Sequence, residues 1–267
     1  MNFHTCEVKS PDGTVVGCEI DGAGPPLLFV HGSTADRNRW AAVRGALARR
    51  FTLCLMDRRG RGLSASEPAA SAYALEREAE DVAAVAAAIG PGVAVLAHSY
   101  GGACVLEAAA TGAALGRMLV YEPAFGTDPG GPVFPVAALA VVEEALARGD
   151  REEALRTFFA DVLLLTPEHI DTMRETEAWR ARVAVVHTLP REARAANAYR
   201  VRAGAGRGGD SVRFLLGTET APPLVASTRA AAAAWPWSAV RELQGHGHAA
   251  MDADPELFVR EVVDWLD

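Results

Sequence analysis

The sequence predicts an α/β fold in which helices cover both faces of a mostly parallel central sheet, and three observations lead to that prediction. Short apolar runs typical of buried strands alternate with longer stretches that have apolar residues at helical spacing. Hydrophobic residues make up 50% of the 267-residue chain, which is ample for a core. The alternation stops between residues 125 and 210, where only helical patterns follow one another. We therefore expect a core domain of residues 1–124 and 211–267 with a helical insertion of residues 125–210.

The first part of the chain predicts an antiparallel hairpin followed by strands with helices between them. Asp12 and Gly13 form an Asp-Gly pair between two alternating segments, a pattern typical of a tight turn. Asp36 can cap a helix that ends at Arg49. Another helix starts at Leu75 with acidic residues in its first turns, where the helix dipole favours negative charge. Strands are expected at residues 6–10, 14–20, 27–30 and 51–56, and helices at residues 40–49 and 75–89.

The second part of the chain predicts four more strands and the helical insertion. The central strand, residues 93–96, leads into a helix that ends at about Ala114. Within the insertion, helices are expected at residues 133–148, 151–164, 167–188 and 190–202, with little β signal. The core is completed by strands at residues 117–121, 212–216 and 239–243, a helix that ends at Trp235 and a terminal helix over residues 255–266.

Residues 97–102, Ala-His-Ser-Tyr-Gly-Gly, stand between the central strand and its helix and carry the clearest chemical signal. Ser99 has small residues two positions before and two positions after it, Ala97 and Gly101. A turn this sharp leaves no room for bulk at those positions, and it makes the serine hydroxyl project from the sheet edge. The pattern predicts a nucleophilic serine. A purely structural turn is the alternative, because Ala97 stands where the strict pattern has glycine.

Two other stretches follow expected strand ends. Residues 31–33 are His-Gly-Ser after strand 27–30, and residues 245–248 are Gly-His-Gly-His after strand 239–243. Together with the turn at Ser99, they make the sequence similar to the α/β-hydrolase superfamily of serine hydrolases over nearly the whole chain. The resemblance implies an α/β-hydrolase fold in which the helical insertion forms a cap, or lid, over the active site.

The resemblance also implies roles for individual residues. Ser99 is the nucleophile of a catalytic triad, and the backbone N–H groups of Ser33 and Tyr100 form the oxyanion hole. His248 matches the family's base better than His246, because the family's Gly-x-Gly-His pattern ends on it. A His-x-His pair could also bind a metal ion, but no acidic or cysteine cluster supplies further ligands at recognisable spacing. We therefore expect no metal.

The triad acid is the point at which the sequence departs from the commonest family pattern. That pattern has an aspartate three residues beyond a glycine, after the strand that here ends at Leu216, and Thr220 stands at that position. Glu219 is one residue away and is the alternative acid. Glu122 follows the strand after the nucleophile at the same sheet edge, where some members, notably haloalkane dehalogenases, place their acid. We expect Glu122 to be the acid, with a glutamate that only caps or pairs at the cap hinge as the alternative.

Three further features are expected to be structural. The glycines of residues 57–64 have the wrong spacing for a dinucleotide-binding loop, and no helix starts directly after them, so no cofactor is expected. The resemblance implies instead a turn in which Asp57 and the arginines form hydrogen bonds and ion pairs. His31 is expected to hydrogen-bond its own loop, and His98 to be a surface, turn or cap residue.

Composition and charge restrict the partners that we expect. The net charge is −8 and acidic residues are scattered along the chain, so no basic face is expected for nucleic acid. The longest apolar segment, residues 132–146, is interrupted by glutamates and too short to span a bilayer. The first residues lack a secretory pattern, which predicts a cytoplasmic location. Four cysteines without C-x-x-C spacing are expected to be free thiols: Cys6, Cys18, Cys54 and Cys104.

The resemblance implies cofactor-free hydrolysis of an ester, lactone or thioester of a small organic molecule through an acyl-enzyme. An aspartate at position 99 would indicate epoxide or haloalkane chemistry, so Ser99 counts against both. A carbon–carbon bond hydrolase or a cofactor-free oxygenase on the same scaffold is one alternative. A ligand-binding, receptor-like protein with little turnover is an alternative of another class. The substrate and the oligomeric state stay open.

Overall fold

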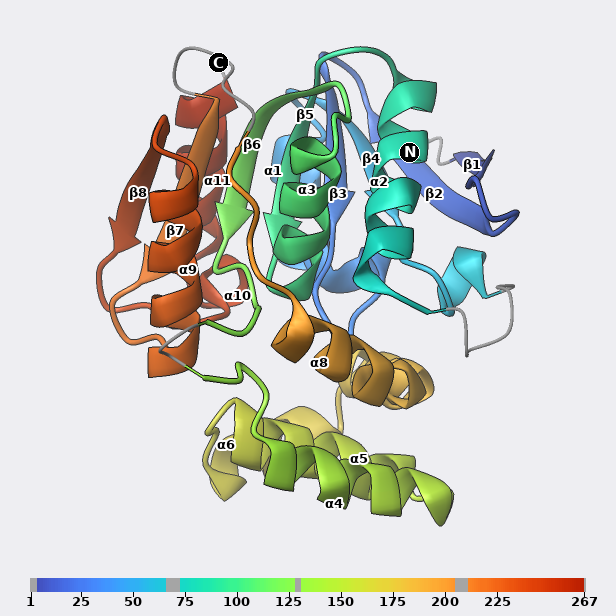
Figure 1. Ribbon diagram of the computed structural model, residues 1–267, viewed down its shortest axis with the longest axis vertical. Helices are drawn as coiled ribbons and strands as arrows, with labels where there is room; N and C mark the ends of the chain where they lie inside the picture. The colour runs from blue at the N-terminus through green and yellow to red at the C-terminus, as the bar shows by residue number, and fades with distance from the viewer. Residues whose placement is uncertain (1–3, 66–72, 128–130, 205–210, 267) are drawn as a thin grey trace.

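The structure is a computed structural model that describes residues 4–65, 73–127, 131–204 and 211–266. Within these residues lies an eight-stranded sheet in the order β1-β2-β4-β3-β5-β6-β7-β8 (Figure 1). β1 and β2 form the expected antiparallel hairpin, β2 runs antiparallel to β4, and the other neighbouring pairs are parallel. The predicted α/β class is therefore confirmed. The strands are β1 (His4–Lys9), β2 (Val15–Gly22), β3 (Pro26–Val30), β4 (Thr52–Met56), β5 (Val93–His98), β6 (Leu115–Tyr121), β7 (Val212–Gly217) and β8 (Ser238–Leu243).

Helices cover both faces of the sheet, and strand residues alternate between the two faces. On β5, Val95 and Ala97 face the larger of two hydrophobic clusters, whereas Leu96 faces the smaller one. The larger cluster includes residues of α2 (Leu75–Ile89), α3 (Tyr100–Ala110) and α9 (Pro222–Ala234). The smaller one includes residues of η1 (Arg37–Trp40), α1 (Ala41–Leu47), α10 (Ala250–Ala253) and α11 (Pro255–Leu266). A short 3-10 turn, η2 (Gly62–Ser64), follows β4.

The segment between β6 and β7 is helical in the part that the structure describes, and residues 205–210 at its expected boundary lie outside that part. Figure 1 shows α4, α5 and α6 beyond the sheet end toward which β6 runs, with α8 between them and the core. α8 packs against α2 and α3. The elements are α4 (Val136–Ala147), α5 (Arg151–Thr157), the π-helix η4 (Phe158–Val162), α6 (Pro167–Arg174), α7 (Glu177–Val185), η5 (Val186–Thr188) and α8 (Leu189–Ala198).

The prediction of one continuous helix over residues 167–188 is wrong. The chain breaks after Arg174 and starts again as α7, because Thr176 takes an extended conformation and caps the new helix. Its hydroxyl oxygen accepts a hydrogen bond from the Trp179 N–H at 3.1 Å. The helix after the central strand also ends earlier than expected, at Ala110.

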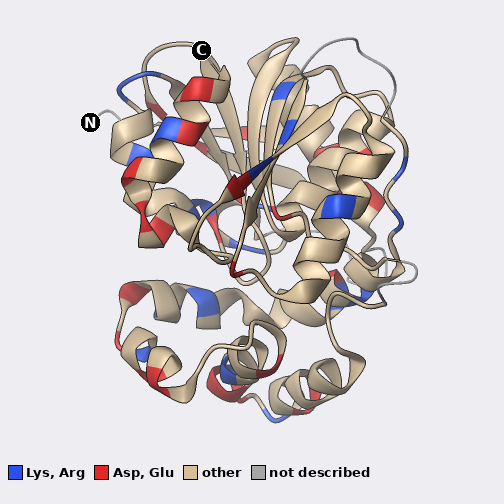
Figure 2. Ribbon diagram, turned by 90° about the vertical axis from the view of Figure 1, so that its left-hand side faces the viewer, with Lys and Arg blue, Asp and Glu red and all other residues tan. Residues whose placement is uncertain are grey.

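The edge strand β8 is largely exposed and carries charges of both signs. Figure 2 looks onto this edge of the sheet and shows basic and acidic residues on the strand nearest the viewer. Arg241 pairs with Glu261 at 2.9 Å, and Glu242 lies 3.7 Å from Arg229. Charged residues on an exposed edge strand disfavour pairing with another chain. In the described part of the chain, no helix combines the length and apolarity needed to cross a bilayer, and the cytoplasmic location stays a prediction.

Candidate active site

Ser99 occupies a strained turn between β5 and α3. Its φ of 56° and ψ of −129° are unusual for a residue other than glycine. The surrounding structure holds this conformation, because the Ser99 N–H donates to the Tyr121 carbonyl oxygen at 2.9 Å. The Ser99 carbonyl oxygen accepts from Gly102 N–H at 2.8 Å and from Ala124 N–H at 3.1 Å. A turn fixed in this way presents one side chain at the carboxyl end of the central strand.

Two glycines bring the loop after β3 against this turn. A Cβ atom at Gly101 would lie 2.4 Å from the His31 carbonyl oxygen, and one at Gly32 would lie 2.7 Å from the Cβ of Ser99. Only glycine fits at either position, so backbone next to Ser33 lies in contact with the serine. Tyr100 is the first residue of α3, so its N–H has no acceptor within the helix. The N–H of Ser33 also has no acceptor among the residues that the structure describes.

Glu122 and His248 meet at the same sheet edge. Glu122 directly follows β6, is fully buried and has a φ of 46°. One carboxylate oxygen, Oε2, lies 2.5 Å from Nδ1 of His248. The other, Oε1, accepts from Gly217 N–H at 2.7 Å and from the Thr220 hydroxyl at 2.5 Å. A carboxylate at Nδ1 assigns the ring proton to that nitrogen and leaves Nε2 of the neutral ring as an acceptor.

Thr220, which stands where the commonest family pattern has its acid, is thus a hydrogen-bond donor to Glu122. Glu219 is exposed, and its carboxylate makes no hydrogen bond or ion pair within the described ranges. Its backbone N–H donates to the His246 carbonyl oxygen at 2.9 Å. Between the two candidate acids, the structure brings Glu122 to the imidazole and leaves Glu219 in solvent.

His98 supports His248, a role that the sequence interpretation missed. The two imidazole rings lie 4.4 Å apart, and Nε2 of His98 lies 3.0 Å from the His248 carbonyl oxygen. Burial, and then the neighbouring His248, hold the pKa of His98 well below its usual range. The ring stays neutral and donates its Nε2–H to that carbonyl. The sequence pattern that could have indicated this is the two-residue spacing of Leu96 and His98 on β5. Side chains two apart on a strand share a face, and Leu96 faces a hydrophobic cluster.

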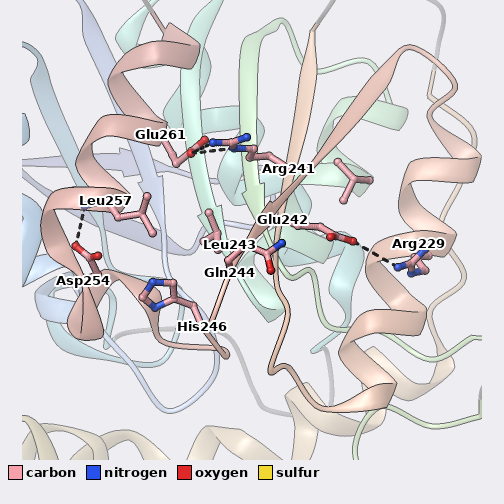
Figure 3. A pocket seen from close by; sticks show the side chains of 10 residues that line it. Arg229, Arg241, Glu242, Leu243, Gln244, His246, Asp254, Leu257 and Glu261 are labelled. Atoms are coloured by element: carbon pink, nitrogen blue, oxygen red, sulfur yellow. Dashed lines mark hydrogen bonds and ion pairs between the residues drawn. The ribbon is translucent and has the colours of Figure 1, made fainter.

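His246 lies in a different place from His248. It lines a groove of about 730 Å³ beside β8 that includes neither Ser99 nor Glu122 (Figure 3). The groove is largely polar: Figure 3 shows Arg241 directed at Glu261 and Arg229 at the carboxylate of Glu242. Among the described residues, no group of three His, Cys, Asp or Glu side chains could hold a metal ion. The geometry therefore favours His248 over His246 as the partner of Glu122.

The loop of residues 57–64 has the structural role expected of it. Asp57 accepts hydrogen bonds from the N–H of Arg37 at 2.7 Å and the N–H of Leu63 at 2.8 Å. A Cβ at Gly62 would lie 2.1 Å from a carboxylate oxygen of Asp57, so the loop is filled by its own acidic side chain. His31 also behaves as expected, since it accepts from Arg58 N–H at 3.1 Å and bonds the Gly32 carbonyl at 2.9 Å.

A buried ion cluster, defined as Arg58, Arg61, Glu78 and Glu192, joins this loop to the helical insertion. Arg58 contacts Glu78 at 2.7 Å and Glu192 at 3.1 Å, and Arg61 also pairs with Glu192. All four side chains are buried, and their charges balance. Burial alone would raise the pKa of the Glu192 carboxyl, but the two guanidinium groups hold it well below its usual range. α8 is therefore fixed to the core by charge.

The same cluster contacts the loop and turn around Ser99. A guanidinium nitrogen of Arg58 donates to the Gly32 carbonyl oxygen at 3.1 Å. The Arg58 guanidinium carbon also lies 4.6 Å from the centre of the Tyr100 ring. Sequence reasoning foresaw arginines that hold a turn, but not the partner in the insertion, since Glu192 lies 131 residues from Arg61 along the chain.

Comparison with protein families gives one model that covers most of the chain. A model described as the alpha/beta hydrolase family matches residues 27–261, which include the sheet from β3 onward, the turn at Ser99 and the loop that ends in His248.

Two curated relatives share part of the chain. A Mycobacterium tuberculosis protein named "Probable oxidoreductase EphD" is 38% identical over 104 residues, which are 38% of this chain and 18% of that protein. The N-formylmaleamate deformylase of Pseudomonas putida is 31% identical over 168 residues, which are 60% of this chain and 62% of the deformylase. The matched stretch spans less than two thirds of the length of each relative.

Two solved structures superpose on nearly the whole chain. An alpha/beta hydrolase from Sphaerobacter thermophilus has a TM-score of 0.80 and 28% identity, and covers 98% of this chain and 100% of that one. The esterase RhEst1 from a Rhodococcus species has a TM-score of 0.74 and 26% identity, with 97% of each chain covered. Coverage this complete includes the helical insertion as well as the sheet.

Proposed function

Because the chain belongs to the alpha/beta hydrolase family, we propose that it is a serine hydrolase that cleaves an ester, lactone or thioester of a small organic molecule through an acyl-enzyme. The hydrogen bond between Glu122 and Nδ1 of His248, at the sheet edge where Ser99 is presented, is the observation that carries the proposal. A buried carboxylate that orients a neutral imidazole at the sheet edge of a serine supports activation of that hydroxyl as a nucleophile.

In the proposed first half-reaction, Nε2 of His248 takes the proton of the Ser99 hydroxyl while its oxygen attacks the carbonyl carbon. The imidazolium that forms is stabilised by Glu122, whose carboxylate pairs with no arginine or lysine among the described residues. The negative oxygen of the tetrahedral intermediate accepts hydrogen bonds from the N–H groups of Ser33 and Tyr100. Collapse breaks the bond to the alcohol or thiol, which leaves with the proton from His248.

In the second half-reaction, His248 removes a proton from water, which attacks the acyl carbon on Ser99. The same oxyanion donors act again, and collapse returns the proton to the serine oxygen and releases the acid. Every group in this cycle belongs to the chain, so the proposed reaction uses no cofactor.

The names of two similar proteins agree with acyl transfer to water, whereas the Mycobacterium tuberculosis relative is named an oxidoreductase. The Pseudomonas putida relative is named a deformylase, and the Rhodococcus structure is named an esterase. Both names describe the addition of water at a carbonyl carbon, which is the reaction that a serine, an imidazole and an oxyanion hole support. These two names favour a hydrolase over the ligand-binding, receptor-like alternative.

We also propose that residues 125–210 form a cap that lines the substrate pocket. Two contacts support this role. Glu192 on α8 reaches the arginines of the loop beside the oxyanion donors, and Arg182 on α7 donates to Thr34 in that loop. Since α4 to α8 stand at the carboxyl end of the parallel strands, a ligand at Ser99 would lie between them and the sheet.

Fluorophosphonate labelling combined with ester turnover tests the proposed function. We expect Ser99 to be the only serine modified, and p-nitrophenyl esters to be hydrolysed over many turnovers by the wild type. Ser99→Ala should lose both, and Ser238→Ala on the edge strand should keep both. Labelling of another serine, or equal turnover by Ser99→Ala, would refute the assignment. Stoichiometric labelling without sustained turnover of any ester, lactone or thioester would identify a ligand-binding protein instead.

A further inference from the structure

Arg182 places a cation of the insertion beside the proposed oxyanion hole. It lies on α7, and its Nη1 donates to the carbonyl oxygen of Thr34 at 3.3 Å and to the Thr34 hydroxyl at 3.4 Å. Thr34 directly follows Ser33 and has a φ of 52°, so the loop turns sharply at the point of contact. The guanidinium carbon also lies 5.5 Å from the centre of the Phe159 ring. α7 thus meets the core at the loop that carries an oxyanion donor, and Arg182 is packed there against an aromatic ring of its own insertion.

Unlike the neighbouring arginines, Arg182 has no carboxylate partner among the described residues. Arg37 and Arg58 each have a carboxylate oxygen at 2.7 Å, and Arg61 is also paired. In the part of the chain that the structure describes, Arg182 forms no ion pair, and its only hydrogen-bond acceptors are the two oxygens of Thr34. Of its five N–H donors, those on Nε and Nη2 have no acceptor from the described residues.

The two carboxylates that face Arg182 from neighbouring elements are engaged elsewhere. Asp252 lies 2.7 Å from Arg39, and Asp36 accepts from Asn38 N–H at 2.8 Å at the start of η1. Burial, and then the positive charge of Arg39, lower the pKa of Arg182 to about 10. A partly buried guanidinium that stays charged without a close counter-ion is unfavourable. A bound anion would stabilise it.

We propose that Arg182 binds a carboxylate of the substrate, so that the molecule cleaved at Ser99 carries an acidic group close to its scissile carbonyl. The inference rests on the proposed function and specifies its substrate class. An arginine presents two parallel N–H donors to a carboxylate, and its unused Nε and Nη2 donors form such an edge. Because Nη1 is held by Thr34, next to Ser33, the anion would lie within a few bonds of the carbonyl that the oxyanion hole receives.

Arg182 is in this view a specificity residue. An anionic substrate would supply the counter-ion that the described residues do not provide, whereas a neutral substrate of the same shape would leave the guanidinium without one. Lysine could supply the charge but not the paired donors, so it should restore only part of the preference. Charged hydrogen bonds of this kind are worth about ten- to a hundredfold in relative rate.

Two esters that differ in one group test the inference: p-nitrophenyl hemiglutarate, which has a terminal carboxylate, and p-nitrophenyl glutaramate, its neutral amide counterpart. We expect the ratio of kcat/KM for the acid over the amide to exceed about ten in the wild type. The ratio should fall about ten- to a hundredfold in Arg182→Gln and less in Arg182→Lys. Arg180→Gln, on an exposed residue of the same helix, should keep the wild-type ratio. Rates are corrected with Ser99→Ala, and Tm verifies folding.

The outcomes separate this inference from the proposed function. If the wild type hydrolyses both esters without preferring the acid, or Arg182→Gln keeps the preference, the inference is wrong and the hydrolase assignment stands. If neither ester is turned over, calorimetric titration of glutarate into wild type and Arg182→Gln decides. Binding that only the wild type shows supports the anion site without the hydrolase, and no binding by the wild type overturns the inference as well.

Discussion

Glu122 and Glu192 are both fully buried carboxylates, but their partners differ in kind. Glu122 accepts hydrogen bonds from a backbone N–H, a hydroxyl and an imidazole. Glu192 lies between the guanidinium groups of Arg58 and Arg61. Neutral donors solvate the first carboxylate, and permanent cations neutralise the second.

This difference in partners assigns Glu122 a role in catalysis and Glu192 a role in stability. The negative charge of a carboxylate surrounded by neutral donors is not neutralised. It can therefore stabilise a positive charge that forms during the reaction, here the imidazolium of His248. The charge of a carboxylate paired with two cations is already neutralised. Its removal leaves the buried cations without a counter-ion. Substitution of Glu122 should therefore affect rate, and substitution of Glu192 should affect stability.

The largest effect on kcat is expected for Ser99 and His248, the residues that exchange the proton. Ser99→Ala and His248→Gln should each lower kcat by several orders of magnitude, and the double variant should be little worse than either, because the members of a triad act as a unit. Steady-state kinetics on p-nitrophenyl esters measure this. Losses that multiply in the double variant would show that the two residues act independently.

Glu122→Gln should lower kcat by about a thousandfold with the fold intact, because an amide cannot stabilise the imidazolium as a carboxylate does. Glu219→Gln is the matched control: it is exposed, has no partner for its carboxylate among the described residues, and should change kcat by less than about twofold. The reverse ranking would assign the acid role to Glu219. Tm of both variants distinguishes lost chemistry from lost structure.

Glu192→Gln should lower the free energy of unfolding by about 3 kcal/mol, because it leaves Arg58 and Arg61 with one carboxylate between them. Glu143→Gln, which removes an ion pair with the exposed Arg194 in the same insertion, should cost less than about 1 kcal/mol. Urea denaturation measures both changes. Equal losses would mean that burial does not distinguish the two pairs.

The difference in unfolding free energy between the wild type and Glu192→Gln should depend on pH. The pKa of Glu192 is lower in the folded chain than its usual value of 4.5, so its stabilising effect is complete above that value and is lost as pH falls toward the folded pKa. The stability difference between the wild type and Glu192→Gln should therefore be constant from pH 6 to 8 and shrink below about pH 4. A difference that grows in acid would contradict the ion cluster.

The smallest effect concerns one donor to Glu122. Thr220→Val removes the hydroxyl that donates to Oε1 and leaves the other two donors in place. Loss of one neutral hydrogen bond should lower kcat about two- to tenfold. Thr172→Val, on the exposed surface of α6, should leave it unchanged. A loss as large as that of Glu122→Gln would mean that Thr220 positions the carboxylate alone.

The sequence predicted elements whose signals are local. Strand alternation, the Asp-Gly turn and the apolar periodicity of residues 75–89 gave elements that agree with the structure, and the last agrees at both ends. The break at Thr176 was missed because its capping bond competes with a periodicity that continues through it. The candidate residues Ser99, Glu122 and His248 could be named because their motifs and positions resemble those of the α/β-hydrolase superfamily, and because strand ends of a parallel sheet share an edge.

Other features depend on contacts between distant segments and could not be predicted in this way. Glu192 had no distinguishing neighbour in the sequence, and its meeting with Arg58 follows from how α8 packs on the core. The helical pattern around Arg182 likewise shows a helix without showing what the helix faces. Side-chain pairing across an insertion is decided by tertiary packing, which periodicity does not encode.

The anchoring of α8 determines how the site can open. A rigid swing of the whole insertion would pull Glu192 away from two guanidinium groups and leave buried charges without counter-ions. In the described ranges, α4 to α6 form no ion pair with the core: their ion pairs join neighbours within the insertion and are largely exposed. We therefore expect any opening of the site to leave α8 in place and to displace α4 to α6 instead.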